Sequence, residues 1–366
     1  MKVIIDWSIL CRICWHRMES KNYIPVYEFE LAEFSMNLAK DVLYYRERFP
    51  DAEIIFALDD KTYWRQKIYT KFYRENTKCF RDIDEESYLL EFDGRKHCVK
   101  YSDIAHRYII STVPKKEFDP SNWNHIDYAE LPEEVLAFIP KYKGARLKAK
   151  WKAKTTKAEF KAFLPKYAKH LATIVDARVI HVKQCEADDV AYALSVKFPA
   201  ETKVYVTYDS DWHQIATTDM FTYFVDPRDK SAPEIDRIEI HRKLMIKIMG
   251  GDDTDSIPGI TLKTGGKVGE DKAIAIYDTY GRGTHKYILA NADASYMRNI
   301  RLINLKNMPP TVLAYVTTAV DSVYEAYGSR IKKESPYTWK DFGVSPRDIL
   351  VVKNEANHHR EADTFP

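Results

Sequence analysis

Short apolar runs alternate with stretches of helical periodicity in two parts of the chain, residues 1–78 and 171–225. Four of these runs have the length and composition of buried strands: 2–5, 53–58, 177–182 and 203–207. Between the first two, residues 29–49 have apolar positions at helical spacing. Strands that alternate with helices predict an α/β fold with a mostly parallel sheet flanked by helices.

The other segments have different patterns. From 79 to about 140 the periodicity weakens to short mixed segments around three prolines, which we interpret as an insertion. From about 233 to 366 helical periodicity dominates, interrupted by a glycine-rich stretch at 250–269. We therefore expect an α/β domain over 1–232 that contains the insertion 79–140, and a helical C-terminal domain over 233–366.

The composition permits a large buried core, since 45% of the 366 residues are hydrophobic. No apolar stretch reaches the roughly 18 residues of a membrane span, and no signal-peptide pattern is present. We therefore expect a soluble, cytoplasmic protein with no membrane partner. The odd number of cysteines fits a reducing compartment, and we expect Cys11 and Cys14 to be packed thiols in a helix.

Carboxylate side chains follow all four predicted strands. The acids at or just after the strand ends are Asp6, Asp59, Glu186, Asp188, Asp189, Asp209 and Asp211, with Asp60 adjacent to Asp59. The carboxyl ends of parallel strands line one crevice, where ligands bind. Single acids at such positions often cap a helix or a turn. So many together require cations, because like charges repel in a partly buried site.

A second acidic cluster lies in the glycine-rich stretch, where Asp252 and Asp255 are three residues apart. Further glycines follow at 259, 265, 266 and 269, and a helical pattern begins near Lys272. A glycine-bearing turn between two helices suits approach to a phosphate backbone, because bare backbone N–H groups can contact the phosphates. The alternative is a surface Gly/Asp loop; the ligand spacing of an EF-hand is absent.

Positive charge is concentrated between residues 141 and 169, where ten Lys and one Arg face one acid, Glu159. The net charge of the whole chain is only +2, so this run differs from its surroundings. A solvated face is the ordinary explanation of such a run. A polyanion partner is the better one here, with Trp151 or Tyr142 stacking on an unpaired base.

Motifs of nucleophilic enzymes and of zinc proteases are absent from the sequence: it contains no GxSxG, no GxxxxGK[ST] and no HExxH. Oxygen ligands without cysteine favour Mg²⁺ or Mn²⁺. Two such ions held about 3.5–4 Å apart stabilise the attacking and leaving oxygens of a phosphodiester.

The ordered acidic motifs resemble those of the 5′-nuclease (flap endonuclease) superfamily, which has a PIN-like fold. The resemblance is carried by Asp6, Asp59, 186–189, 209–211 and 251–255, and runs through most of residues 1–310. The segments 63–65 and 298–305 resemble the branch of phage ribonuclease H type 5′→3′ exonucleases. The resemblance implies that Asp6, Asp59, Glu186, Asp188, Asp209 and Asp211 bind metal, and that Asp189, Asp252 and Asp255 complete the site.

The resemblance also implies how the substrate is bound. Tyr142-Lys143-Gly144-Ala145-Arg146 resembles a family segment whose Lys143 and Arg146 would reach the scissile phosphate, and 141–170 would form a helical arch around a 5′ single strand. Arg74 and Lys78 are a rival pair of cations. The glycine turn would be a helix–three-turn–helix that grips duplex DNA and binds K⁺. The expected DNA-binding residues are Arg65, Lys148, Lys150, Trp151, Lys152, Lys154, Gly259, Gly266, Lys267, Gly269 and Lys272.

The expected activity is that of a Mg²⁺-dependent 5′→3′ exonuclease and structure-specific flap endonuclease of phage DNA replication or primer removal. Mn²⁺ would substitute for Mg²⁺, and Asp188 and Asp209 would be central to catalysis. The substrate would be DNA with a 5′ flap, a nick or a free 5′ end, or an RNA–DNA hybrid. We expect a monomer that meets replication proteins. The alternatives are a PIN-type endoribonuclease and an inactive nucleic-acid-binding replication factor.

Overall fold

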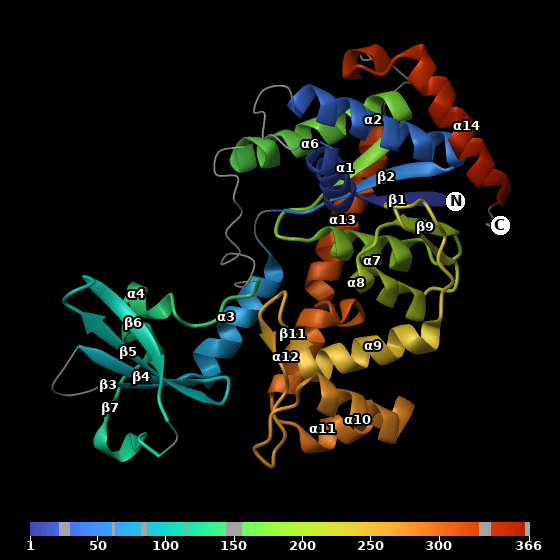
Figure 1. Ribbon diagram of the computed structural model, residues 1–366. Helices are drawn as coiled ribbons and strands as arrows, with labels where there is room; N and C mark the ends of the chain where they lie inside the picture. Colours follow the sequence, from blue (N-terminus) through green and yellow to red (C-terminus); the bar gives the residue numbers. More distant parts are fainter. Residues whose placement is uncertain are drawn as a thin grey trace. The chain divides into compact units, whose positions relative to one another are not determined.

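The computed structural model describes residues 1–21, 30–60, 63–81, 86–114, 116–143, 156–328 and 338–362. The chain forms two compact units, neither of which is one continuous segment (Figure 1). Unit 1 comprises Met1–Tyr63, Trp151–His241 and Leu305–Pro366. Unit 2 comprises Trp64–Lys150 and Arg242–Asn304.

A five-stranded parallel sheet forms the centre of unit 1, in the order β10-β9-β1-β2-β8. The strands are β1 (Lys2–Asp6), β2 (Glu53–Leu58), β8 (Ala177–His181), β9 (Lys203–Val206) and β10 (Thr222–Val225). The first four confirm the predicted strands, and β10 is additional. The register pairs Asp6 with Ala57 and Ile5 with Val206, so β2, β1 and β9 end at the same edge of the sheet.

Helices cover both faces of this sheet (Figure 1). One face packs against α1 (Trp7–Lys21), α2 (Glu30–Arg48) and α6 (Thr156–Val175), and α14 (Pro346–Ala362) packs on α2. On the other side are α7 (Ala187–Lys197), α8 (Ser210–His213) and α13 (Pro310–Gly328). Strands buried on both faces have continuous apolar sequences, which explains why they could be recognised as runs. Val3, Ile5 and Phe56 are fully buried in this core.

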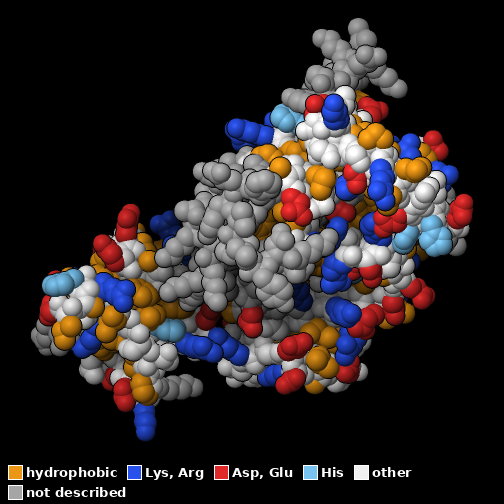
Figure 2. Space-filling view, turned by 45° about the horizontal axis from the view of Figure 1, so that its top comes forward, with side chains coloured by type: hydrophobic (Ala, Val, Ile, Leu, Met, Phe, Trp, Pro, Cys, Tyr) orange, Lys and Arg blue, Asp and Glu red, His pale blue; other side chains and the backbone are white. Residues whose placement is uncertain are grey.

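The segment interpreted as an insertion forms an antiparallel sheet in unit 2, in the order β6-β5-β4-β3-β7. Its strands are β3 (Lys78–Arg81), β4 (Ser87–Phe92), β5 (Arg95–Ser102), β6 (Arg107–Thr112) and β7 (Asn124–His125), followed by α4 (Glu133–Leu136). The turn between β4 and β5 is Asp93-Gly94, with φ of 54° and 63°, as a tight hairpin of two residues requires. Tyr101, Ile104, Ile109 and Ile110 are exposed, and orange hydrophobic side chains appear on the surface in Figure 2.

The rest of unit 2 is helical. It contains α3 (Trp64–Asn76), most of α9 (Arg237–Gly250), α10 (Glu270–Tyr280), α11 (Thr284–Asn291) and α12 (Ser295–Ile303). A short hairpin of β11 (Gly251–Asp252) and β12 (Ile257–Pro258) follows α9, and α12 packs on α3. Two positions here require glycine: Gly251 has φ of 91°, and a Cβ on Gly259 would collide with the carbonyl oxygen of Val268.

The predicted fold class is confirmed: a parallel α/β sheet flanked by helices, with a helical C-terminal region and two helices, α9 and α10, flanking the glycine-bearing segment. The division of the chain differs from the predicted boundary at 232/233. Residues 64–150, which were expected in the first domain, belong to unit 2, and residues 305–366, which were expected in the second domain, belong to unit 1. Cys11 and Cys14 are buried free thiols whose pKa values are raised by burial, as expected for packed side chains. Among the described helices, none is long and apolar enough to cross a membrane.

Candidate metal centre and nucleic-acid interface

Three of the predicted metal ligands lie at the ends of three adjacent strands of unit 1. Asp6 is the last residue of β1, Asp59 directly follows β2, and Asp209 comes three residues after β9. Thr207 connects two of them: its hydroxyl donates to Asp6 Oδ2 over 3.3 Å and accepts from the backbone N–H of Asp209 over 3.0 Å. The strand order therefore brings these carboxylates to one edge of the sheet, as the sequence predicts.

Asp6 is the most strongly perturbed acid of this group. Only 4% of the residue is exposed, and its Oδ1 accepts from the backbone N–H of Ile9 over 3.0 Å. Burial raises the pKa of Asp6 well above its ordinary value, and the negative charges of Asp59 and Asp209 raise it further. The hydrogen bonds from Ile9 and Thr207 lower the same pKa but do not offset these causes. A buried carboxylate near two others is a site that favours a cation.

The next group of acids lies at the start of α7. The backbone N–H of Ala187 donates to Asp59 Oδ1 over 2.9 Å, which holds Asp59 against this helix N-terminus. Glu186 is 5% exposed and is the N-cap, and its backbone N–H donates to Asp189 Oδ2 over 2.9 Å. Asp189 is fully buried, so part of its role is to close this helix end. Asp188 is half-buried in the same turn.

Asp59 and the adjacent Asp60 have different surroundings. Asp60 Oδ2 accepts from the backbone N–H of Gln184 over 2.6 Å, and its Oδ1 lies 3.4 Å from His181 Nε2. Asp60 is thus engaged with the end of β8, whereas Asp59 is the neighbour whose charge raises the pKa of Asp6. The structure therefore places Asp59, the preferred candidate, beside the other carboxylates.

The acids are not arranged as a closed ligand set. Among the described residues, no three His, Cys, Asp or Glu side chains converge closely enough to hold an ion. Asp6, Asp59 and Asp209 instead each accept from a backbone N–H, that of Ile9, Ala187 or Asp211. Carboxylates near one another repel and turn towards available donors, so an ion would have to compete with these backbone hydrogen bonds.

Asp252 and Asp255 belong to unit 2, where Asp252 has a neutralising partner. Lys247 Nζ lies 3.0 Å from Asp252 Oδ2, and Asp252 Oδ1 accepts from the backbone N–H groups of Thr254 and Asp255. Burial raises the pKa of Asp252, but Lys247 and these hydrogen bonds outweigh burial and lower it below the ordinary value. Asp255 Oδ2 accepts from the hydroxyl of Tyr142 over 3.1 Å.

One of the two expected phosphate-binding cations lies next to this hairpin. The backbone N–H of Lys143 donates to the carbonyl oxygen of Asp255 over 2.6 Å, and Lys143 has a positive φ of 56°. The rival cations are elsewhere in unit 2, with Arg74 over the ring of Tyr128 and Lys78 beside Glu91. The structure thus joins Lys143, and neither rival, to an acid of the predicted site.

Several expected nucleic-acid-binding residues lie outside the described part of the chain. These are Arg146, Lys148, Lys150, Trp151, Lys152 and Lys154. The continuation of the basic run forms a helix, as the composition of this segment predicts: α6 begins at Thr156. On the other expected surface, Lys267, Gly269 and Lys272 are exposed. A Cβ added to Gly266 would lie 3.2 Å from Lys272 Nζ, so that cation lies near the turn.

The prediction that Arg65 binds DNA is wrong, because its side chain is buried. It is 2% exposed, its Nε donates to the carbonyl oxygen of Leu302 over 3.1 Å, and its guanidinium lies over the ring of Trp64. A guanidinium buried in this way fixes α3 against α12 and is not presented to a ligand. This burial could not be predicted from the sequence, because the partner of Arg65 lies more than 200 positions away in the chain.

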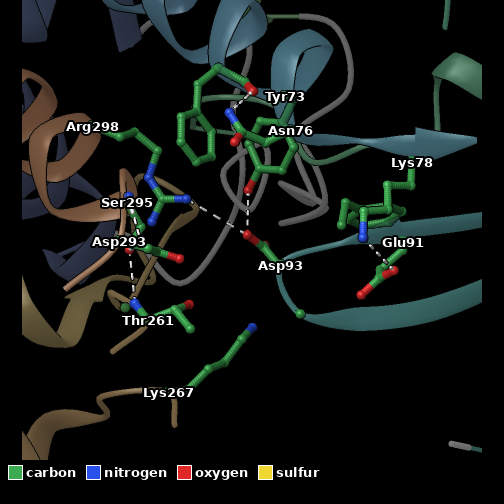
Figure 3. Close-up of a pocket in the computed structure, with 14 residues that line it drawn as sticks. Tyr73, Asn76, Lys78, Glu91, Asp93, Thr261, Lys267, Asp293, Ser295 and Arg298 are labelled. Atoms are coloured by element: carbon green, nitrogen blue, oxygen red, sulfur yellow. Dashed lines mark hydrogen bonds and ion pairs between the residues drawn. The ribbon is translucent and has the colours of Figure 1, made fainter. Parts of the chain in front are cut away.

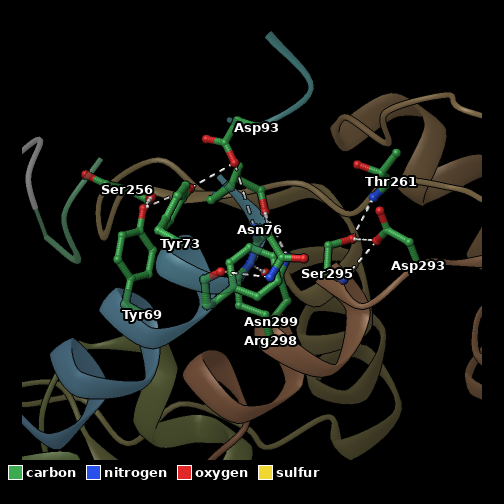
Figure 4. A network of polar contacts seen from close by, with 12 residues as sticks. Tyr69, Tyr73, Asn76, Asp93, Ser256, Thr261, Asp293, Ser295, Arg298 and Asn299 are labelled. Carbon is green, nitrogen blue, oxygen red and sulfur yellow. Dashed lines mark hydrogen bonds and ion pairs between the residues drawn. The ribbon is translucent and has the colours of Figure 1, made fainter. Parts of the chain in front are cut away.

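A network of polar contacts fixes the segment 298–305 that resembles the phage branch (Figure 4). Arg298 donates to the side chain of Asn299 and to the carbonyl oxygen of Pro258, each over 2.7 Å. Asn299, which is fully buried, donates to the carbonyl oxygens of Ile248 and Pro258 over 2.9 Å. The hydroxyl of Tyr69 donates to the carbonyl oxygen of Ser256. These contacts tie α3, α9 and α12 to the hairpin that carries Asp252 and Asp255.

The sequence did not identify Thr207 or Lys247 as part of the site. Thr207 is 1% exposed and lies two residues before Asp209, so its position after a strand was visible but its partner was not. Lys247 lies in the last turn of α9, five residues before Asp252. A cation near a helix C-terminus is ordinary, and only the hairpin fold shows that it pairs with Asp252.

The chain resembles solved 5′-nucleases. It is similar to a bacteriophage T5 5′-exonuclease with bound zinc ions, with a TM-score of 0.49 and 12% identity over 96% of this chain and 99% of that chain. A T5 protein co-crystallised with metal ions, and a T5 flap endonuclease in a pseudo-enzyme–product complex with DNA and metal ions, each have a TM-score of 0.48 and 12% identity, over 96% of this chain and 98% of theirs.

These structures are 5′-nucleases, the family that the acidic motifs resemble. No protein-family model matches the chain, and no curated protein matches its sequence.

Proposed function

We propose that this protein is a divalent-metal-dependent 5′→3′ exonuclease and structure-specific flap endonuclease. It hydrolyses phosphodiesters of DNA, or of an RNA–DNA hybrid, near a 5′ end, in phage DNA replication or primer removal. The observation that carries the proposal is the buried carboxylate of Asp6 at a strand end, whose pKa is raised by burial and by Asp59 and Asp209.

The donor set fits a hard cation. Its side chains are carboxylates without a cysteine or histidine among them, which is the chemistry that Mg²⁺ and Mn²⁺ prefer. In our proposal Asp6, Asp59, Glu186, Asp188, Asp209 and Asp211 hold two ions, and Asp189, Asp252 and Asp255 support them. When bound, such ions polarise a phosphoryl oxygen and stabilise the charge of the attacking and leaving oxygens.

The protein's own groups have separate roles in the proposal. Thr207 orients Asp6 and the Asp209 backbone, and the N-terminus of α7 orients Asp59. Lys143 and Arg146 offset negative charge on the transferring phosphoryl group. The glycine-bearing segment between α9 and α10 contacts the backbone of duplex DNA through Gly259, Gly266, Lys267, Gly269 and Lys272, and K⁺ binds there. The basic run 141–170 contacts the single strand.

The test is cleavage of an end-labelled 5′-flap substrate with Mg²⁺, mapped to the nucleotide, with nicked, gapped, RNA–DNA and single-stranded RNA substrates in parallel. We expect Asp188→Asn together with Asp209→Asn to abolish cleavage and to leave flap binding unchanged within about a few-fold, because the ions act on the reacting phosphate and the DNA is held by other surfaces. Mn²⁺ should replace Mg²⁺ in the wild type.

The matched control is Asp226→Asn. Asp226 follows β10, an outer strand of the same sheet, and is neutralised by Arg228 at 2.5 Å. The Asp226→Asn variant should cleave the flap substrate like the wild type. Retained Mg²⁺-dependent cleavage by the double variant would contradict the proposal. Cleavage of single-stranded RNA in preference to flap DNA would favour the endoribonuclease, and binding without any product would favour an inactive replication factor.

A further inference from the structure

A pocket in unit 2 is lined mostly by residues that have no role in the proposed reaction (Figure 3). It has a volume of about 170 Å³. Its walls come from the hairpin turn Asp93-Gly94 of the antiparallel sheet, from α3, from Lys267 of the glycine-bearing segment, and from 293–298 at the start of α12. Segments that are far apart in the sequence thus enclose one polar space.

The acid at the hairpin turn is already neutralised. Asp93 Oδ1 accepts from the hydroxyl of Tyr73 over 2.8 Å and lies 3.8 Å from Arg298 Nη1 (Figures 3 and 4). Arg298 is 5% exposed and also lies over the ring of Phe72. Asp93 and Arg298 therefore form part of the pocket wall and satisfy one another.

The other two acids of the pocket also have partners, a cation for Glu91 and neutral donors for Asp293. Glu91 Oε2 lies 3.9 Å from Lys78 Nζ on the neighbouring strand. Asp293 accepts from the backbone N–H of Ser295 over 2.8 Å and from its hydroxyl, at the start of α12. Glu91 therefore has a cation beside it, whereas the donors to Asp293 are neutral.

Two further cations belong to this region: Lys267 lines the pocket, and Arg95 follows the lining residue Gly94 in the chain. Lys267 points towards the hairpin turn in Figure 3, and a Cβ built on Gly94 would lie 3.3 Å from its Cε. Arg95 directly follows Gly94 and is exposed. Within the described part of the chain, neither Lys267 nor Arg95 has a carboxylate within 4.0 Å.

These two cations also repel each other. Burial lowers the pKa of Lys267, and the charge of Asp93 opposes this effect. The positive charges of Arg95 and Arg298 lower the same pKa by smaller amounts. The same charges act on His97, whose pKa is lowered by burial and then by Arg95, with a smaller contribution from Lys267. An anion between Arg95 and Lys267 would remove this repulsion, since each cation would gain an opposite charge.

We infer that this pocket binds a phosphate group of a nucleic-acid strand between Arg95 and Lys267, so that the antiparallel sheet extends the nucleic-acid surface of the glycine-bearing segment. The inference rests on the proposed function, which supplies the substrate class. The pocket is smaller than the roughly 300–1,000 Å³ of ordinary ligand sites, so it suits a phosphate rather than a whole nucleotide. Arg and Lys are the usual phosphate partners.

The test measures equilibrium binding of duplex DNA in EDTA, where no cleavage occurs, between about 50 and 200 mM KCl. Arg95→Ala and Lys267→Ala should each weaken binding and lower the slope of log K against log salt by about 1. Arg107→Ala is the matched control, because Arg107 is exposed at the start of β6 in the same sheet but is not at the pocket. It should bind with the wild-type slope.

The source of the phosphate is identified with modified duplexes. One arm replaces single internal phosphodiesters by neutral methylphosphonates, and the other compares 5′-phosphate with 5′-hydroxyl ends. The effect of Arg95→Ala should vanish on the duplex that lacks the bound phosphate, which identifies a backbone diester or a terminal monoester. An effect that persists on every modified duplex would overturn the inference.

The inference and the proposed function fail in different ways. If the wild type binds duplex DNA and both Arg95→Ala and Lys267→Ala bind with the wild-type slope, the inference and the DNA contact assigned to Lys267 are overturned, and the proposed cleavage reaction stands. If both variants lower the slope but the wild type cleaves no substrate with Mg²⁺ or Mn²⁺, the nuclease proposal is overturned and the phosphate site stands. Unchanged thermal unfolding of both variants establishes that altered binding is not loss of fold.

Discussion

The two groups of predicted metal-binding acids differ in how their charge is compensated. In unit 1, Asp6 and Asp59 receive hydrogen bonds from neutral donors, and no described Lys or Arg is paired with either. In unit 2, Asp252 is paired with Lys247 and accepts two backbone hydrogen bonds. The pKa of Asp6 is accordingly raised by burial, and that of Asp252 is lowered by its partners.

This difference separates acids that the fold leaves without a compensating cation from an acid that has its own. Clustered carboxylates that the fold leaves uncompensated cost stability in the metal-free protein, and such arrangements are kept where function requires them. An acid with its own Lys contributes to folding instead. We therefore expect substitutions in the first group to reduce activity more, and substitutions in the two groups to change stability in opposite directions.

The largest expected difference is in cleavage. Asp6→Asn should lower the rate of Mg²⁺-dependent flap cleavage by more than the roughly 10–100-fold that loss of an outer-shell partner costs. Asp252→Asn should stay within that range, because Lys247 already neutralises Asp252 in the fold. Single-turnover rates with saturating enzyme measure both. Asp60→Asn is the control, since Asp60 is engaged by Gln184 and His181, and it should cleave like the wild type.

The next effect is a loss of stability in unit 2. Asp252→Ala should lower the free energy of unfolding by about 2 kcal/mol, because it removes an ion pair and two hydrogen bonds to the backbone. Asp252→Asn should cost less, since an amide oxygen still accepts from Thr254 and Asp255. Urea unfolding in EDTA gives both values. Equal stability of the alanine variant and the wild type would mean that Lys247 does not stabilise the hairpin.

The smallest effect has the opposite sign. In EDTA near neutral pH, Asp6→Asn should raise the free energy of unfolding by about 1 kcal/mol, because a buried carboxylate no longer has to ionise. The folded pKa of Asp6 is raised, so its contribution is present below the ordinary carboxyl pKa and is lost as the pH rises through the folded value. The variant should therefore lack this decline. Asp252, whose pKa is lowered, contributes stability that is lost as the pH falls.

Urea titrations of the wild type and of Asp6→Asn at several pH values check this prediction, with Mg²⁺ added in a parallel series. Mg²⁺ should stabilise the wild type more than the variant. An Asp6→Asn protein that is less stable than the wild type at neutral pH would show that its carboxylate is compensated after all.

The parallel sheet could be predicted from the sequence because its strands are buried on both faces and are therefore continuous apolar runs. The acids at their ends followed directly, since strand order alone places Asp6, Asp59 and Asp209 together. The antiparallel sheet was missed because its strands mix exposed and buried positions, as in β5. A local signal was present: Asp93-Gly94 between two β-rich runs is a strong hairpin sequence.

The partners of the acids could not be predicted, because each depends on packing between distant segments. Lys247 lies near Asp252 because the hairpin folds back on α9. Tyr142 donates a hydrogen bond to Asp255, although the two residues are 113 positions apart in the sequence. The burial of Arg65 under α12 is of the same kind. Sequence motifs identify which residues carry charge, and the tertiary fold decides which charges are neutralised.

The order of the strands has a consequence for synthesis of the protein. β1 lies between β2 and β9, yet about 140 residues separate the end of β2 from Lys203, the start of β9. At about 5–20 residues per second the ribosome takes roughly 7–28 s to make them. Throughout that time one edge of β1 has no strand beside it, and such edges template aggregation. The nascent chain is therefore most vulnerable while the insertion is being translated, before β9 emerges.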